Sequence, residues 1–343
     1  MGRLIAPPLS VALVGSTSTG KSTLGNALLG RYLLPCGVQA TTHRIINVAQ
    51  SVTCGHAQIE GRNGWKSWAT DTECRDEMKR ALSNSAPVVR VKAALATSRY
   101  EWWRRHPVVG WRRGFARLGR LTYFSDDFLL VDSPGVAHAG DRAGLEAISE
   151  VVRNSTVALL VLSAGETDSQ KEAQIVSACF RGLAGKPGRV VVVMNKMDVF
   201  DRDEASDATR ANILASRQKV VTELAQRAGL GETDVPVVPM IASAAFCAEV
   251  MPWSGTTLDA ADQAFLRTGV ADACRLLIPQ DTDALPRRVD DWSASQLKNA
   301  LCALRRASGL VEILRQLANT AFAPAARGRP ASNSSASRWP DER

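Results

Sequence analysis

Long hydrophobic runs are missing from this 343-residue chain. No stretch approaches the ~20 uninterrupted apolar residues that a helix needs to cross a bilayer, so the sequence predicts no membrane span. The first residues lack the small-residue cleavage site of a signal peptide. Ala6 stands where a myristoylation signal carries Ser or Thr. With 45% hydrophobic and 22% charged residues, the composition is that of a globular protein, and we expect a cytoplasmic location.

Paired cysteines are also missing. The seven cysteines are scattered along the chain and contain no CxxC pair, which argues against a disulfide framework and against a zinc site. Free thiols in this number fit a reducing compartment. We therefore expect most of the cysteines to be small core residues.

Positive charge is confined to one part of the chain. Lys and Arg number 42 against 34 Asp and Glu, which gives a formal net charge of +8. Nine basic residues and a single acid, Glu101, stand between Arg90 and Arg120, so this segment accounts for the whole excess. A dedicated nucleic-acid binder is expected to be basic over a larger part of its sequence. The pattern predicts a near-neutral domain with one basic insertion at about residues 90–120.

Short apolar runs alternate with amphipathic helical patterns over most of the chain. Strand-like runs occur at 9–14, within 45–60, and at 127–132, 157–164, 189–195 and 235–244. Helical patterns occur at 21–30, 70–82, 141–154, 168–183 and 206–229. This alternation predicts an α/β fold in which a mostly parallel central sheet carries helices on both faces. We expect one domain over 1–322, with a short helical C-terminal extension at about 257–322 and a disordered tail at 323–343.

A glycine-rich turn follows the first predicted strand. The sequence GSTSTGKS, from Gly15 to Ser22, fits the phosphate-loop pattern GxxxxGK[ST] between a strand and a helix. Backbone N–H groups and the helix N-terminus would bind the β-phosphate, Lys21 would bridge the β- and γ-phosphates, and Ser22 would ligate Mg²⁺. A chance lysine in a glycine turn is disfavoured by the flanking strand and helix. The predicted nucleotide-binding residues here are Gly15, Ser16, Thr17, Thr19, Gly20, Lys21, Ser22 and Thr23.

A second motif, DSPG, closes the apolar run at 127–132. At the end of such a strand, the Asp132 carboxylate can hold a magnesium ion through water, and the Gly135 N–H can meet a γ-phosphate. On its own this tetrapeptide is a common turn. Behind a phosphate loop it predicts a segment that is released when the γ-phosphate is lost.

A third motif, NKMD, closes the run at 189–195. The Asp198 carboxylate would accept hydrogen bonds from guanine N1–H and the exocyclic amine, and sites of this kind discriminate between bases by ~10⁴ or more. Lys196 would lie along the base, while Asn195 would tie this loop to the phosphate loop. Ser243 and Ala244 fit a further base-contacting loop through the Ala244 N–H. Together the motifs predict GTP or GDP with Mg²⁺.

These motifs and a Thr-Thr pair at 41–42 stand in the order found in translation-factor-like P-loop GTPases. The stretch KSTLGNALLGRYLLPCGVQATT closely resembles the bacterial members of the dynamin family. The resemblance covers about residues 9–50 and 121–322, and it implies the P-loop GTPase fold.

The resemblance also implies catalytic roles. Thr41 or Thr42, of which Thr42 has the more suitable spacing, would bind Mg²⁺ and position the attacking water. Ser18 matches the phosphate-loop serine that stabilises catalysis in dynamins. Val136 stands where other GTPases carry a water-positioning glutamine.

As in dynamins, the resemblance implies that GTP hydrolysis is activated when two domains dimerise across the nucleotide. The residues after Ser243 are too few for the long helical stalk of that family, so we expect no polymerisation through a stalk of this chain alone. Two alternatives stay open. The chain is a slow or non-hydrolysing GTP switch that recruits a separate stalk or membrane protein, or it is a GTPase that acts on RNA or the ribosome.

The basic insertion contains three of the eight tryptophans, at positions 102, 103 and 111. On a helical wheel Val108, Trp111, Phe115 and Leu118 share one face. A basic amphipathic segment with aromatic anchors over 99–120 fits an anionic membrane surface at the inner face of a membrane, with ~1 kcal/mol per basic residue, or a separate stalk protein. Its glycines favour simple packing on the GTPase core, and alternating Arg and aromatic residues also suit RNA. These interpretations stay open.

Overall fold

A computed structural model describes residues 9–36, 44–50, 56–61, 64–83, 88–93, 128–166, 168–183, 189–200, 206–230, 235–282 and 285–322. The predicted switch threonines Thr41 and Thr42 lie outside these ranges, as do the segment 94–127 and the tail 323–343. The interpretations of the Arg/Trp-rich segment 99–120 therefore fall outside the described residues.

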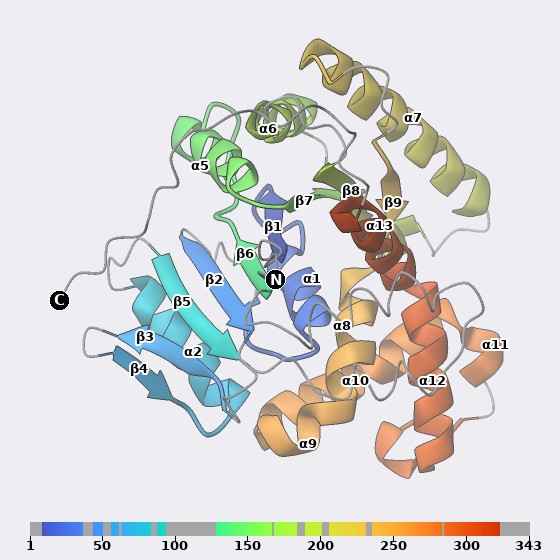
Figure 1. Ribbon diagram of the computed structural model, residues 1–343. Coiled ribbons are helices and arrows are strands. Elements are labelled where there is room, and N and C mark those ends of the chain that lie inside the picture. Colours follow the sequence, from blue (N-terminus) through green and yellow to red (C-terminus); the bar gives the residue numbers. More distant parts are fainter. Residues whose placement is uncertain are drawn as a thin grey trace, which may run out of the picture.

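The strands of the described residues join in one sheet. They are β1 (Leu9–Gly15), β2 (Ile45–Gln50), β3 (Gln58–Gly61), β4 (Gly64–Ser67), β5 (Val88–Ala93), β6 (Phe128–Asp132), β7 (Val157–Ser163), β8 (Val190–Asn195) and β9 (Val237–Pro239). Their order is β4-β3-β5-β2-β6-β1-β7-β8-β9 (Figure 1). β1 is parallel to β6 and β7, and β8 is parallel to β7 and β9, whereas β2 is antiparallel to β6. β7 and β8 are buried along their whole length, as strands covered on both faces must be.

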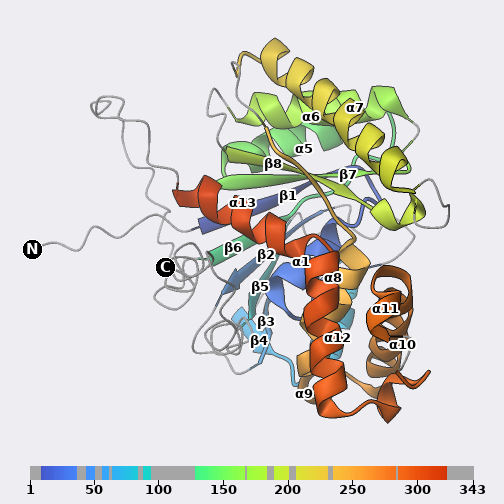
Figure 2. The same ribbon diagram turned by 90° about the vertical axis from the view of Figure 1, so that its right-hand side faces the viewer.

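Helices cover this sheet on both faces. The helices of the described residues are α1 (Lys21–Leu29), α2 (Asp71–Ser83), α5 (Arg142–Arg153), α6 (Ser169–Gly182), α7 (Ser206–Arg227), α8 (Ala242–Val250), α9 (Ser254–Thr257), α10 (Ala260–Leu277), α11 (Pro279–Thr282), α12 (Ala294–Ala307) and α13 (Leu310–Phe322). Figure 2 shows α5, α6 and α7 on one side of the sheet, with α1, α8 and the C-terminal helices on the other. The predicted α/β fold with a mostly parallel sheet is confirmed.

The helical patterns expected at 21–30 and 70–82 are present as α1 and α2, and each has a local sequence signal at one boundary. α1 ends at Gly30, which adopts a left-handed conformation with φ +66°, the common conformation just after a helix. α2 begins after a reciprocal capping box in which the Glu73 N–H donates to Thr70 Oγ1 (3.1 Å) and the Thr70 N–H donates to the Glu73 carboxylate (3.3 Å). These signals are local in sequence, so they are readable without knowledge of the tertiary structure.

Two predictions need correction. The apolar run 235–244 was expected to be one strand, but β9 covers Val237–Pro239 and α8 begins at Ala242. Periodicity cannot separate a short buried strand from a buried helix, and the alanine-rich sequence after Ile241 favours the helix. The basic insertion was expected to begin at about Arg90, but Arg90 and Lys92 lie on β5 within the sheet.

The C-terminal helices share the core of the sheet. On α13 the side chains of Leu310, Ile313 and Leu314 are buried. On α12 the Arg305 guanidinium forms an ion pair of 2.7 Å with Glu249 of α8, and both side chains are at most 7% exposed. The predicted helical extension is therefore packed into the same hydrophobic core as the sheet. Within the described residues, none of the helices has both the length and the apolar character required to cross a membrane.

Replacing Glu249 by Ala should lower the free energy of unfolding by about 3–5 kcal/mol, because it removes the carboxylate against which the Arg305 guanidinium is buried. Urea unfolding monitored by circular dichroism measures this loss. Asp76→Ala on α2 is the control, since Asp76 pairs with Lys79 at an exposed position and exposed pairs contribute ~0.2–1 kcal/mol. Equal losses in the two variants would contradict a role for the buried pair in holding α12 on α8.

Candidate nucleotide-binding site

The candidate residues gather at the carboxyl ends of the parallel strands. β1 ends in the phosphate loop, β8 ends in NKMD, and β9 leads into α8. The loop after β7 joins them, since the Ala164 N–H donates to the Asn195 carbonyl at 2.8 Å. In open α/β sheets this edge is where ligands bind. The fold therefore brings motifs separated by more than a hundred residues into one place.

The phosphate loop has the backbone shape that its glycines allow. Gly20 has φ +92°, and a Cβ at this position would lie 2.3 Å from Asn195 Nδ2. Glycine is required here both by the backbone conformation and by the close approach of a side chain. Ser18 has φ +60° and is exposed at the outer part of the loop. Directly after Gly20, α1 begins and directs its first N–H groups at the loop.

Lys21 is buried within the loop that it follows. Its ammonium group donates to the carbonyl oxygens of Ser16 (2.7 Å) and Gly15 (3.4 Å), and the residue is 5% exposed. Burial lowers the pKa of the ammonium to about 8, although the nearby Asp132 carboxylate opposes the shift. A buried cation without strong compensation is stabilised by an anion that enters the loop. This is the electrostatic requirement of a phosphate site.

Ser22 and Asp132 are in direct contact. The Ser22 hydroxyl donates to Asp132 Oδ2 at 2.7 Å, and Asp132 is 0% exposed. Its other oxygen, Oδ1, has no hydrogen-bond partner among the described residues. Burial raises the pKa of the carboxyl, while Lys21 and the Ser22 hydrogen bond lower it. A hydroxyl and a buried carboxylate with an unused oxygen are hard donors of the type that Mg²⁺ takes.

The DSPG segment is joined to the phosphate loop by backbone hydrogen bonds. The Thr17 N–H donates to the Val136 carbonyl (3.0 Å), and the Val136 N–H donates to the Gly15 carbonyl (3.4 Å). A Cβ on Gly135 would lie 2.7 Å from Thr17 N and Cα, so a side chain there would separate the two loops. The two motifs thus form one surface, and a ligand that contacts one loop affects the position of the other.

Asn195 connects the NKMD loop after β8, here called the base loop, to the phosphate loop and to the start of α8. Its Nδ2 donates to the Thr19 carbonyl at 2.7 Å, and its Oδ1 accepts from the Ala242 N–H at 2.8 Å. The side chain is 3% exposed. It therefore satisfies one backbone group of the phosphate loop and one of the orphan N–H groups at the start of α8. Asn195 thus contacts the phosphate loop, as expected from the sequence, and also the start of α8, which the sequence did not indicate.

The remaining base-loop candidates flank Asn195. Lys196 is exposed and has φ +62°, which turns the chain sharply after β8. Asp198 follows in a 3₁₀ turn, η2 (Met197–Phe200), and is half-buried. Ser243 and Ala244 lie in the first turn of α8, where Ser243 is exposed and Ala244 is buried. The Ala244 N–H thus belongs to a helix N-terminus rather than to the loop that the sequence predicted.

Thr23 lies differently from the other phosphate-loop candidates. Its hydroxyl donates to Cys36 Sγ at 3.7 Å, and its side chain therefore faces the peptide that follows α1. The Thr23 side chain therefore points away from the phosphate loop, towards Cys36.

Sequence reasoning missed Glu166 in the loop after β7. Its carboxylate lies 3.5 Å from Ser16 Oγ and forms an ion pair of 2.7 Å with Lys171 of α6. No local motif marks Glu166, and its proximity to the phosphate loop depends on β7 pairing with β1. Its position after a strand at the carboxyl edge is the one signal that points to it.

A groove of 1360 Å³ lies elsewhere, between α5 and α6. Its lining includes Arg142, Glu146 and Glu150 of α5 and Gln170 and Arg181 of α6. Phosphate-loop and base-loop residues are absent from the lining that the described residues form. The glycine loop, the buried Lys21 and the Asp132 carboxylate instead converge at the strand ends, which makes that edge of the sheet the candidate site.

The chain resembles known proteins over part of its length. The family model of the dynamin family matches residues 11–197. The chain is 27% identical over 190 residues to the transmembrane GTPase Marf of Drosophila melanogaster, a match that covers 55% of this chain and 20% of Marf. The chain thus spans about a fifth of the length of that relative.

Two solved structures are also similar to the chain. Both come from work on an oligomerised bacterial dynamin pair, described as a mechanism for long-range sensing and tethering of membranes. One is 14% identical with a TM-score of 0.41 and covers 90% of this chain and 50% of its own. The other is 13% identical with a TM-score of 0.42 and covers 91% of this chain and 40% of its own.

Replacing Asn195 by Ala should lower the free energy of unfolding by about 2–6 kcal/mol, because it leaves two buried backbone groups without their partner at ~1–3 kcal/mol each. Urea unfolding in the absence of nucleotide measures this loss. Ser243→Ala, exposed in the first turn of α8, should change stability by less than about 0.5 kcal/mol. If Asn195→Ala were as stable as Ser243→Ala, the hydrogen bonds of Asn195 would contribute nothing to the free energy of unfolding.

Proposed function

Because this chain belongs to the dynamin family of GTPases, we propose that it binds GTP at the strand-end site and hydrolyses it to GDP and phosphate. The observation that carries this proposal is the arrangement of Lys21, Ser22 and Asp132. A buried ammonium, a hydroxyl and a buried carboxylate with an unused oxygen lie around one glycine loop. These are the groups that a nucleoside triphosphate and its metal require.

Binding of the phosphates falls to the loop and to α1. The N–H groups at the start of α1 and the helix dipole attract the β-phosphate. Lys21 exchanges its contacts with the Gly15 and Ser16 carbonyls for phosphate oxygens, and the bound anion favours its charged form. Ser22 and Asp132 would hold Mg²⁺, which neutralises phosphate charge when bound. Gly135, packed against Thr17, is placed to sense the γ-phosphate through its N–H.

Recognition of the base falls to the loop after β8. Asp198 accepts hydrogen bonds from guanine N1–H and the exocyclic amine, and Lys196 lies along the ring. The Ala244 N–H adds a donor from the first turn of α8. Asn195 fixes the loop relative to the phosphate loop by its contacts with Thr19 and Ala242. Base and phosphates are thereby held at a fixed separation, which supports selection of a guanine nucleotide.

Hydrolysis requires a group that stabilises charge as the γ-phosphate is transferred to water. Ser18 is the residue we propose, since it lies exposed in the loop with a left-handed backbone. Thr42 would position the water, and Val136 offers no side chain that could do so. The exposed position of Ser18 supports a site that is completed when a second copy of the chain covers the nucleotide face.

Turnover should rise with protein concentration. Phosphate release per molecule is expected to increase as the concentration of purified protein is raised with Mg²⁺ and GTP in excess, because dimerisation completes the site. Lys21→Ala should reduce turnover by about 100-fold or more, since it removes a cation aimed at transition-state charge. Equal release by wild type and Lys21→Ala would refute hydrolysis at this site. Tight GTP binding without turnover at any concentration would instead identify a GTP switch.

Asp198→Asn should weaken GDP binding by roughly 100-fold, in line with ~1.5–3 kcal/mol for hydrogen bonds to a charged group. The amide can pair with a base that presents a carbonyl at the same position, so xanthosine diphosphate should bind the variant better than GDP does. Isothermal titration with both nucleotides measures the exchange of preference. An unchanged preference for guanine would contradict the assignment of Asp198.

A further inference from the structure

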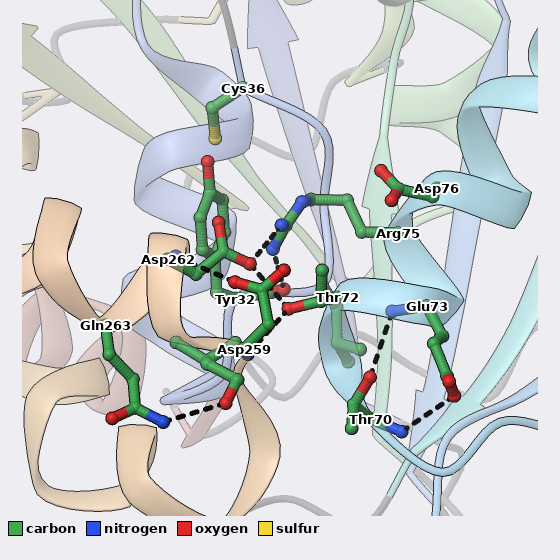
Figure 3. Close-up of polar contacts among 12 residues, drawn as sticks. Tyr32, Cys36, Thr70, Thr72, Glu73, Arg75, Asp76, Asp259, Asp262 and Gln263 are labelled. Atoms are coloured by element: carbon green, nitrogen blue, oxygen red, sulfur yellow. Dashed lines mark hydrogen bonds and ion pairs between the residues drawn. The ribbon is translucent and has the colours of Figure 1, made fainter.

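A polar cluster, whose central residue Arg75 is buried, joins three parts of the chain that are distant in sequence. Tyr32 follows α1, Thr72 and Arg75 lie on α2, and Asp259 and Asp262 lie at the start of α10; we call these five residues the Arg75 joint. Figure 3 shows the Arg75 side chain extending from α2 towards Tyr32 and Asp262. The side chains of Arg75 and Asp262 are 5% and 16% exposed. Water therefore competes little for the ion pair between Arg75 and Asp262.

Arg75 uses its guanidinium for three contacts at once. One nitrogen donates to the Tyr32 carbonyl at 3.0 Å, and another forms an ion pair with Asp262. The guanidinium carbon lies 3.8 Å from the centre of the Tyr32 ring. A planar fork can stack on a ring and donate in two directions, whereas a lysine ammonium cannot reproduce this set.

The first turn of α10 is fixed by the same joint. The Thr72 hydroxyl donates to Asp262 Oδ2 at 2.5 Å and accepts from the Asp259 N–H at 3.2 Å. Asp259 caps the helix by accepting from the Asp262 N–H at 2.8 Å. The joint thus holds both the position and the beginning of α10 against α2.

The other side of the joint is attached to the phosphate-loop helix. Asn26 of α1 is fully buried, and its Oδ1 accepts from the N–H groups of Leu33 (2.9 Å) and Leu34 (2.7 Å). Its Nδ2 donates to the Leu34 carbonyl at 2.8 Å. The peptide from Tyr32 to Cys36 is therefore held between α1 and Arg75. In the sequence, four residues separate Cys36 from the Thr-Thr pair at 41–42.

We propose that Arg75 is a positioning residue, which fixes the Tyr32–Cys36 peptide between the phosphate-loop helix and α10 so that the γ-phosphate and the C-terminal helices are coupled. This inference rests on the proposed GTPase function. A buried ion pair adds little net stability compared with apolar packing. Three directional contacts on one guanidinium instead define a single placement of Tyr32 relative to Asp262. Displacement of the peptide on one side then changes the contacts of α10 on the other.

The test compares Arg75→Met with Lys79→Met. Both residues lie on α2, one helical turn apart, and Lys79 is exposed and paired with Asp76. In Arg75→Met we expect kcat for GTP to fall about tenfold, as for misplaced groups near a reacting centre, with the Kd for GDP unchanged. We also expect the effect of a non-hydrolysable GTP analogue on hydrogen exchange in residues 259–266 to disappear. Lys79→Met should behave as wild type in all three measurements.

Two further variants separate positioning from stability. Arg75→Lys keeps the charge opposite Asp262 but not the three contacts of the guanidinium, so it should recover only part of the kcat that Arg75→Met loses. Asp262→Asn keeps an acceptor for Thr72 and should reproduce the uncoupling if Arg75→Met does not fold. Variants that are less stable but keep wild-type kcat and the wild-type exchange response would overturn the proposal.

The wild-type arm of the experiment distinguishes this inference from the function on which it rests. Wild-type protein that neither binds nor hydrolyses GTP would refute the proposed function, and the role of Arg75 with it. If the wild type hydrolyses GTP and the Arg75 and Asp262 variants keep the wild-type kcat and exchange response, only the role of Arg75 is refuted.

Discussion

The site depends on one buried amide. Asn195 donates to the phosphate loop through the Thr19 carbonyl and accepts from the N-terminus of α8 through the Ala242 N–H. Both partners are backbone groups, so the contact is insensitive to which side chains surround it. Each of these groups would otherwise be buried without a partner, which is unfavourable by ~1–3 kcal/mol. One side chain therefore holds the loop after β8 to the glycine loop and to the start of α8.

The phosphate loop is held from its other side by the DSPG segment. Val136 pairs with Gly15 and Thr17, and these bonds extend the pairing of β1 with β6 beyond the strand ends. The loop is consequently preorganised, with little conformational entropy left to lose when an anion binds. Burial disfavours the charged form of Lys21 and lowers the pKa of its ammonium group. A preorganised backbone and a buried ammonium group both favour an anionic ligand over a neutral one at this loop.

The sequence predicts those features that are encoded within a few residues. The Gly30 stop of α1, the Thr70–Glu73 capping box and the glycine loop were all readable, because each depends on local backbone chemistry. The extent of β9 was wrong because an apolar run carries no information on whether its burial is in a strand or a helix. Glu166 and Arg75 were missed for a different reason. Their partners lie 150 and 187 positions away, and no pattern in the sequence reports such pairs.

The C-terminal helices are attached by more than apolar contact. Glu249 pairs with Arg305 between α8 and α12, and Arg75 pairs with Asp262 between α2 and α10. Apolar faces alone allow helices to slide by small amounts with little change in buried area, whereas hydrogen bonds to charged groups weaken steeply with misalignment. The two ion pairs therefore define the register of the helical end relative to the sheet. The start of α8 is bonded to Asn195, and α2 is bonded to the peptide after α1 through Arg75. Both ion pairs therefore attach the helical end to elements that contact the phosphate loop.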